Sequence, residues 1–137
     1  MNLLAVVDRR RKASMTSIDD RTVDVFTEER PWGAFQSFVT NEKVTVKVIT
    51  VDPGQRLSLQ THVDRAEMWQ VLDAAPLDIT VGERTWQAHQ GELIWVPQGE
   101  VHRLGNSGTQ VGRILEVGFG HFDEEDIVRI EDDYSRR

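Results

Sequence analysis

Residues 54–67 read GQRLSLQTHVDRAE, and this stretch decides the fold because it fits two short strands joined by a turn. Side chains alternate along a strand with a period of two, so Gln60 and His62 project from one face. Glu67 follows His62 at an odd spacing, but a turn through residues 63–66 would return its carboxylate to that face. The stretch therefore predicts three polar side chains gathered on one surface of a small β-structure.

A second stretch, residues 91–106, reads GELIWVPQGEVHRLGN and adds a fourth polar side chain. Its apolar run 93–96 predicts a buried strand, and the turn at Pro97–Gly99 directs His102 back toward the interior. Two imidazoles, one carboxylate and one amide oxygen make a mixed nitrogen and oxygen donor set, which suits Zn, Mn, Co, Ni or Fe(II) better than Ca or Mg. The predicted ligands of this divalent metal site are Gln60, His62, Glu67 and His102.

The predicted donor set also limits the chemistry. With Glu67 as the single negative ligand, a divalent ion would keep an excess positive charge that can polarise a carbonyl or hydroxyl oxygen. Two histidines and a carboxylate also describe the facial triad of Fe(II) dioxygenases, although Gln60 would fill a position that those enzymes leave open. A non-catalytic protein that binds a sugar phosphate or another metabolite is the third alternative.

From residue 34 onward, short strand-like runs alternate with turn signals, and no run predicts a helix before residue 118. The predicted strands are residues 34–40, 44–51, 57–62, 67–72, 77–81, 84–88, 93–96, 102–104 and 112–117. Many short strands at this spacing are typical of a sandwich or barrel, which protects its edges and leaves a mouth for a ligand cavity. The acidic C-terminal segment predicts a short helix or an edge strand with a tail.

Composition limits the other classes of function. A chain of 137 residues suffices for one domain with a core, and its formal net charge of -7 argues against a nucleic-acid partner. Cysteine is absent, which excludes disulfides and fits a cytoplasmic protein. The apolar run Leu3–Val7 is too short to cross a membrane, and the basic cluster Arg9–Lys12 follows it in the reverse order of an export signal. We therefore expect no membrane partner. Residues 1–25 are expected to form a flexible N-terminal segment, and the alternative for the first twenty or so is that they lie across a neighbouring subunit.

Both motifs resemble those of the cupin superfamily, and the chain is most similar to the C-terminal cupin domain of the type II mannose-6-phosphate isomerases, which is often fused to a mannose-1-phosphate guanylyltransferase. The resemblance rests on ordered landmarks, which include Arg30-Pro31-Trp32-Gly33, Leu57-Ser58-Leu59-Gln60, His102-Arg103-Leu104 and Glu125-Asp126-Ile127-Val128-Arg129. It implies an all-β cupin domain, a jelly-roll-like double-stranded β-helix, over residues 26–137.

The same resemblance implies a metal-dependent aldose–ketose isomerase that interconverts mannose 6-phosphate and fructose 6-phosphate through an enediol intermediate. Carried over position by position, Gln60, His62, Glu67 and His102 would hold one divalent ion. Zn is the first expectation, with Mn, Co, Ni or Fe as alternatives. A phosphosugar substrate, a homodimer and a cytoplasmic location complete the expectation.

Four further residues are predicted to serve the reaction. Arg65 belongs to the family's R-x-E-x-W signature, which is linked with activity, and it is a candidate for both catalysis and substrate binding. The guanidinium groups of Arg65 and Arg103 suit a phosphate, with salt bridges at the rim as the alternative. Lys47 is a candidate for the base that moves the proton, unless it faces solvent. Trp69 is a candidate for substrate binding through its ring, with core packing as the alternative.

Overall fold

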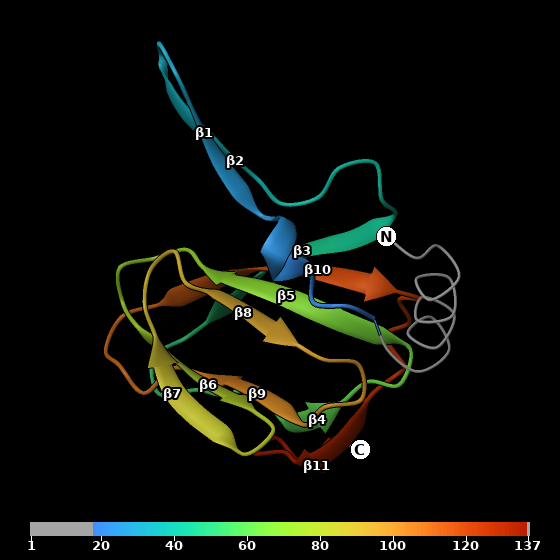
Figure 1. Cartoon of the computed structure of the whole chain (residues 1–137). Helices are drawn as coiled ribbons and strands as arrows, with labels where there is room; N and C mark the ends of the chain where they lie inside the picture. Colours follow the sequence, from blue (N-terminus) through green and yellow to red (C-terminus); the bar gives the residue numbers. More distant parts are fainter. Residues whose placement is uncertain (1–17, 137) are drawn as a thin grey trace, which may run out of the picture.

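Within residues 18–136, which the computed structural model describes, the chain folds into two facing β-sheets and a projecting hairpin (Figure 1). The elements in chain order are η1 (Arg21–Asp24), β1 (Phe26–Arg30), β2 (Gly33–Ser37), β3 (Val44–Val51), β4 (Leu59–Thr61), β5 (Arg65–Val71), β6 (Leu77–Val81), β7 (Arg84–Ala88), β8 (Leu93–Val96), β9 (His102–Gly105), β10 (Gly112–Gly120) and β11 (Val128–Glu131). One large sheet has the order β3-β10-β5-β8, and the other has the order β11-β4-β9-β6-β7. The predicted all-β, double-stranded β-helix is confirmed.

The space between the two sheets is divided into an apolar half and a polar half. Single strands contribute to both halves, because side chains two positions apart share a face. On β5, Glu67 lies on the polar side and Trp69 packs into the apolar core. On β9, His102 lies on the polar side and Leu104 packs into the apolar core. The buried core comprises Val51, Trp69, Val71, Leu77, Ile79, Ala88, Ile94, Val96, Leu104 and Ile114. The core therefore holds in place the strands that carry the polar side chains.

A second apolar cluster lies on the outer face of the four-stranded sheet, where its buried members are Met68, Val117 and Phe119. Ile18 and Val25, which flank η1, pack against this cluster. The flexible segment predicted for residues 1–25 falls largely on residues 1–17, which lie outside the described part of the chain. The predicted domain boundary, with the cupin domain at residues 26–137, stays a prediction.

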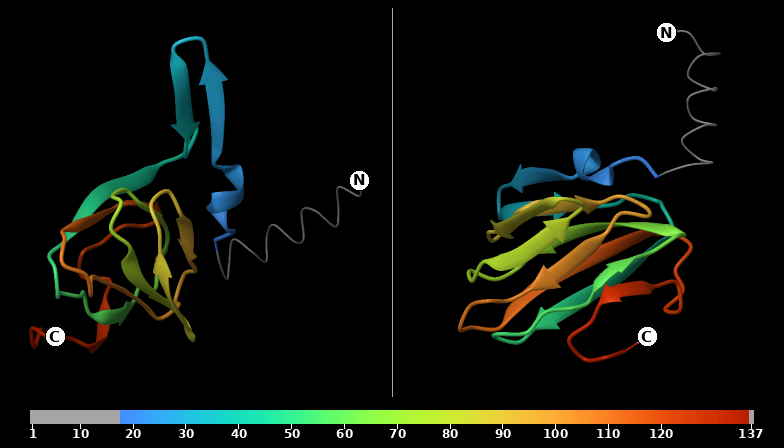
Figure 2. Two further views of the ribbon diagram at one scale, coloured as in Figure 1. Left: turned by 90° about the vertical axis from the view of Figure 1, so that its left-hand side faces the viewer. Right: turned by 90° about the horizontal axis from the view of Figure 1, so that it is seen from below.

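Strands β1 and β2 pair only with each other and form a hairpin that stands clear of the two large sheets (Figure 2). Three aromatic side chains of the hairpin, Phe26, Trp32 and Phe35, are exposed. A side-chain hydrogen bond ties the hairpin to the four-stranded sheet, because Gln70 Nε2 donates to Gln36 Oε1 at 3.1 Å.

The C-terminal acidic segment contains an edge strand, which confirms one of the two predicted alternatives. Strand β11 pairs with β4 at the edge of the five-stranded sheet. Strand β5 begins at Arg65, earlier than the predicted start at Glu67, so the turn after His62 is shorter than expected. Arg65 and Glu67 consequently share the inner face. Among the described residues, no helix has the length and apolar character needed to span a membrane.

Candidate metal centre

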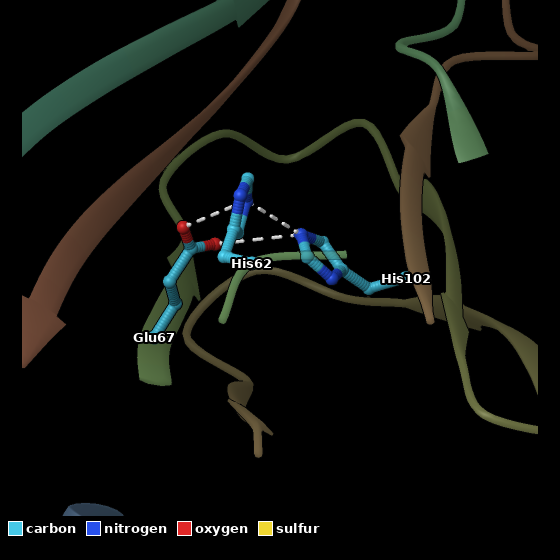
Figure 3. A group of neighbouring side chains, drawn as sticks. All are labelled: His62, Glu67 and His102. Carbon is cyan, nitrogen blue, oxygen red and sulfur yellow. Dashed lines mark hydrogen bonds and ion pairs between the residues drawn. The ribbon is translucent and has the colours of Figure 1, made fainter. Parts of the chain in front are cut away.

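Three side chains from separate parts of the barrel converge in its polar half (Figure 3). His62 follows the end of β4, Glu67 lies on β5 and His102 begins β9. The two imidazole Nε2 atoms are 3.2 Å apart. Glu67 Oε2 lies 3.4 Å from His62 Nε2, and Glu67 Oε1 lies 3.8 Å from His102 Nε2. All three residues are buried, with 4 %, 2 % and 3 % of their surfaces exposed in chain order.

These separations fit a metal ion. Nitrogen and oxygen ligands bind Zn at about 2.0–2.2 Å, so two ligands of a tetrahedral ion are about 3.3–3.6 Å apart. The three observed separations of 3.2, 3.4 and 3.8 Å lie close to that range. The donor set of two imidazoles and one carboxylate therefore has both the chemistry and the spacing to hold a divalent transition metal.

Backbone carbonyl groups fix the tautomer of both histidines. His62 Nδ1 donates to the carbonyl oxygen of Asp126 at 2.7 Å, and His102 Nδ1 donates to that of Glu100 at 2.9 Å. A carbonyl oxygen can only accept, so Nδ1 carries the proton in each neutral ring and Nε2 presents a lone pair. Burial lowers the pKa of both imidazoles and outweighs the opposing effect of the Glu67 charge. Both rings are therefore kept in the neutral form that binds a metal.

Glu67 is oriented by two donors, one to each carboxylate oxygen. Trp69 Nε1 donates to Oε1 and Arg65 Nε donates to Oε2, each at 3.0 Å. Burial acts to raise the pKa of Glu67, but the positive charge that the imidazoles gain on protonation, together with the hydrogen bonds to the carboxylate, outweighs it and holds that pKa below its ordinary value. The carboxylate is therefore ionised and held in place for a cation.

Gln60, the fourth predicted ligand, is buried and lies directly opposite His102 in the pairing of β4 with β9. Its Nε2 donates to Ser58 Oγ at 3.0 Å. The amide oxygen has no hydrogen-bond partner within residues 18–136, so it is the atom that could act as a ligand. Its role as a ligand stays a prediction.

The candidate metal ligands line a cavity of about 180 Å³, and other side chains complete its wall. Lys47 lies on the inner face of β3 and lines this cavity, and 33 % of its side chain is exposed. Its Nζ is 2.8 Å from Glu124 Oε1 and 4.3 Å from the centre of the Phe122 ring. Lys47 is thus brought to the candidate site, where its catalytic role remains untested.

Arg65 and Trp69 also line the cavity, but their observed contacts are structural. Arg65 Nη2 donates to His62 Nε2 at 3.2 Å, in addition to the bond from Nε to Glu67. Its Nη1 donates to the carbonyl oxygen of Asp123 at 3.2 Å. Trp69 is buried in the core and packs edge-on to His102, with ring centres 5.8 Å apart. Trp69 therefore packs in the core while it lines the cavity, and Arg65 orients Glu67. The predicted catalytic and substrate-binding roles of Arg65 and the predicted substrate-binding role of Trp69 stay predictions.

Arg103 is not brought to this cavity. It neighbours His102 on β9, so the period of two turns its side chain to the opposite face of the sheet. There Nη1 is 3.2 Å from Glu131 Oε1, and Nε donates to the carbonyl oxygen of Leu57 at 3.0 Å. The placement corresponds to the salt-bridge alternative and does not support the predicted role of Arg103 in binding substrate at the metal centre.

The sequence interpretation missed Glu116, a buried cavity residue on β10. Burial, reinforced by the charge of Glu67, raises its pKa to about 8. The signal was present in the sequence: Glu116 lies between Leu115 and Val117 and shares a strand face with the core residue Ile114. A carboxyl group at such a position predicts either a buried pair or a functional group.

The segment after β10 closes one wall of the site. The Asp126 carboxylate accepts hydrogen bonds from the backbone nitrogens of Val63 and Asp64, each at 2.8 Å. Its backbone carbonyl holds the His62 ring. Phe122 lies beneath two cations, because Arg65 Cζ is 4.6 Å and Lys47 Nζ is 4.3 Å from its ring centre. This segment therefore fixes the turn between His62 and Glu67.

Comparisons with known proteins agree with this architecture. Residues 19–132 match the family model described as "Mannose-6-phosphate isomerase C-terminal". Similar proteins include "Xanthan biosynthesis protein XanB" of Xanthomonas campestris pv. campestris, which is 42 % identical over 108 residues. They also include "Mannose-1-phosphate guanylyltransferase ManC" of Salmonella typhimurium, 40 % identical over 108 residues. The matches cover 78 % of this chain but only 23 % and 22 % of these two relatives.

Among solved structures, the fold is similar to that of an uncharacterized conserved protein with a double-stranded β-helix domain from Klebsiella pneumoniae subsp. pneumoniae. The TM-score is 0.56 at 21 % identity, and the match covers 68 % of this chain and 78 % of that one. At this identity the similarity supports the fold alone.

Proposed function

The chain belongs to the mannose-6-phosphate isomerase C-terminal family, and from this premise we propose that it is a metal-dependent isomerase that interconverts mannose 6-phosphate and fructose 6-phosphate. The observation that carries the proposal is the convergence of His62, Glu67 and His102 at metal-ligand spacing inside a cavity. The chain spans less than a quarter of the length of these two curated relatives, so activity of this domain by itself is part of the proposal.

A bound divalent ion would polarise the sugar carbonyl and the neighbouring hydroxyl group, which favours an enediol route. Zn fits the donor set, and Mn, Co, Ni and Fe(II) are alternatives. The ligands of the proposal are His62, Glu67 and His102, with the Gln60 amide oxygen as the fourth. Arg65 supports this set as a positioning residue, because its Nε donates to the Glu67 carboxylate.

Isomerisation also requires a group that moves a proton between adjacent carbons. Lys47 and Glu116 line the cavity without belonging to the predicted ligand set. They lie directly opposite each other in the pairing of β3 with β10. We therefore propose that this pair carries the proton, with Lys47 retained as the first candidate for the base and Glu116 as its partner.

The test is a coupled assay with mannose 6-phosphate under anaerobic conditions, run with and without a chelator. Fructose 6-phosphate formed without oxygen, and lost on chelation, is the expected result. Oxygen consumption with a change in the substrate would favour the dioxygenase alternative. Binding of mannose 6-phosphate without turnover would favour the non-catalytic alternative.

The homodimer also remains a proposal. In its favour, an isolated two-stranded hairpin is marginally stable in water, and the β1–β2 hairpin leaves Phe26, Trp32 and Phe35 exposed. Sedimentation velocity measures the mass directly, and a monomer at micromolar concentration would contradict it. A cytoplasmic location remains a proposal too, which fractionation of cells expressing the chain can test.

A further inference from the structure

Arg129 lies in line with two of the candidate ligands across three neighbouring strands. In the pairing of β11 with β4, Arg129 is directly opposite Gln60. In the pairing of β4 with β9, Gln60 is directly opposite His102. Directly opposed residues project from the same face of a sheet, so all three side chains face the interior, and all three line the cavity. Strands are about 4.8 Å apart, which separates Arg129 from His102 by about 10 Å along the sheet.

The Arg129 guanidinium has an unused buried donor. Its Nε is buried and has no hydrogen-bond partner, and within residues 18–136 no other buried side-chain nitrogen or oxygen shares this condition. Buried donors in native proteins are almost always paired, because an unpaired donor loses its hydration without compensation. A donor of this kind at the wall of a cavity is free to bind an acceptor that enters the cavity, either water or a ligand.

The charge of Arg129 is also uncompensated. The two other arginines that line the cavity are engaged: Arg65 is 3.0 Å from Glu67 and Arg136 is 3.0 Å from Asp132. The described part of the chain offers no carboxylate within salt-bridge distance of Arg129, although the chain has a net charge of -7. A permanently charged, forked donor without a carboxylate partner suits the oxygens of a phosphate group, which it can bind with two parallel hydrogen bonds.

We propose that Arg129 forms an anion subsite of the metal cavity and binds the phosphate group of a phosphate monoester. This inference rests on the proposed function, in which the carbonyl end of a phosphosugar faces the histidines. The sugar chain then extends past Gln60 toward β11, where Arg129 binds its phosphate. The subsite selects phosphorylated sugars over free sugars, a discrimination that the three metal ligands alone do not supply.

Inorganic phosphate is the direct probe, and its binding to metal-free protein is measured by isothermal titration calorimetry. Metal-free protein is used first because phosphate can also coordinate Zn. The test variant is Arg129→Gln, and the matched control is Arg84→Gln, which removes an exposed arginine that stacks on Trp86. We expect wild type and the control to bind phosphate alike, and Arg129→Gln to bind it at least about tenfold more weakly.

Zn affinity and the circular dichroism spectrum of Arg129→Gln should match those of wild type, which separates the anion subsite from the metal centre and from folding. If Arg129→Gln does not fold, Arg129→Lys is used. Lysine keeps the positive charge but lacks the paired N–H donors of a guanidinium, so this variant should bind phosphate more weakly than wild type. Phosphate affinity in the folded variant equal to that of wild type, or no binding by wild type, overturns the proposal.

The assay also distinguishes failure of this inference from failure of the proposed function. Phosphate binding that depends on Arg129 in a protein without isomerase activity would leave the subsite intact and remove the isomerase. If the protein is active, Arg129→Gln should raise KM for mannose 6-phosphate about tenfold with a smaller change in kcat. A fall in kcat at unchanged KM would contradict a binding role for Arg129.

Discussion

The Nε2 atoms of His62 and His102 face each other 3.2 Å apart, while each ring donates its Nδ1 proton to a backbone carbonyl. With both rings neutral, the two Nε2 lone pairs point toward the same small space, and the one on His62 also accepts from Arg65 Nη2 at 3.2 Å. Such an arrangement is repulsive unless a cation or a proton lies between the nitrogens. Glu67 adds a carboxylate to the same space, so the three groups together are suited to hold a metal ion.

Removal of one ligand should abolish metal binding without unfolding the barrel. In Glu67→Gln the carboxylate charge is lost, and in His102→Ala an imidazole is lost, while the apolar core on the other side of the cavity is unchanged. We expect the Zn content of the purified variants to fall from about one equivalent to near zero, measured by mass spectrometry of the metal. Circular dichroism should show the β-sheet spectrum of wild type. Full Zn occupancy in both variants would contradict the assigned ligands.

Zn should raise the melting temperature of the protein. A ligand at one hundred times its Kd that binds only the folded state stabilises it by about 2.7 kcal/mol. For a domain of this size the shift is about 10 °C. Differential scanning fluorimetry with a series of Zn concentrations measures the effect. His102→Ala should show no shift, and an equal shift in this variant would place the bound Zn elsewhere.

The pH dependence of metal binding follows from the lowered pKa values of His62 and His102. Two histidines with the ordinary pKa of about 6.5 would lose affinity about threefold between pH 7.5 and pH 6.5, because protons compete with the metal. A lowered pKa moves this competition to lower pH, so the affinity should change less than threefold over that interval. Calorimetric titration of Zn in a weakly coordinating buffer measures it.

The same titration needs a control for Glu116, whose pKa of about 8 places its ionisation in a neighbouring range of pH. The Glu116→Gln variant removes this group and leaves the two histidines to dominate the change below neutrality. A loss of threefold or more between pH 7.5 and pH 6.5 in this variant would mean that the histidine pKa values are not lowered.

Loss of the Asp126 carboxylate should weaken the metal centre from outside the ligand set. The carboxylate holds the backbone nitrogens of Val63 and Asp64, next to His62, and two such hydrogen bonds contribute about 1–3 kcal/mol. We expect Asp126→Ala to weaken Zn binding about tenfold, because groups that orient a ligand affect affinity on this scale. The exposed neighbour Glu125 supplies the control, since Glu125→Gln removes an acidic group of the same segment. Equal Zn affinities in the two variants would exclude this role.

Much of the site could be predicted from local patterns in the sequence. The alternation of side chains along strands placed His62 and Glu67 on one inner face, and the turn before His102 returned it to the same cavity. The same rule turns Arg103, the neighbour of His102 on β9, to the opposite face of the sheet. Glu116 could have been found from its position between two apolar residues on a strand.

The remaining features depend on contacts between distant parts of the chain. The carbonyl group that fixes the His62 ring belongs to Asp126, sixty-four positions away in sequence. Arg129 reaches the cavity only because β11 pairs with β4, and a single sequence specifies neither that pairing nor its register. Such groups can be identified only from a structure that shows β11 beside the strands that carry the ligands.

The most direct test of the account is a metal-reconstitution titration followed by the isomerase assay on the same samples. The protein is stripped with a chelator, dialysed and supplied with Zn or one of the alternative ions in increasing amounts. We predict that the stripped protein is inactive and that conversion of mannose 6-phosphate returns in proportion to bound metal, reaching its maximum at one equivalent. Full activity in protein shown to contain no metal would contradict the account.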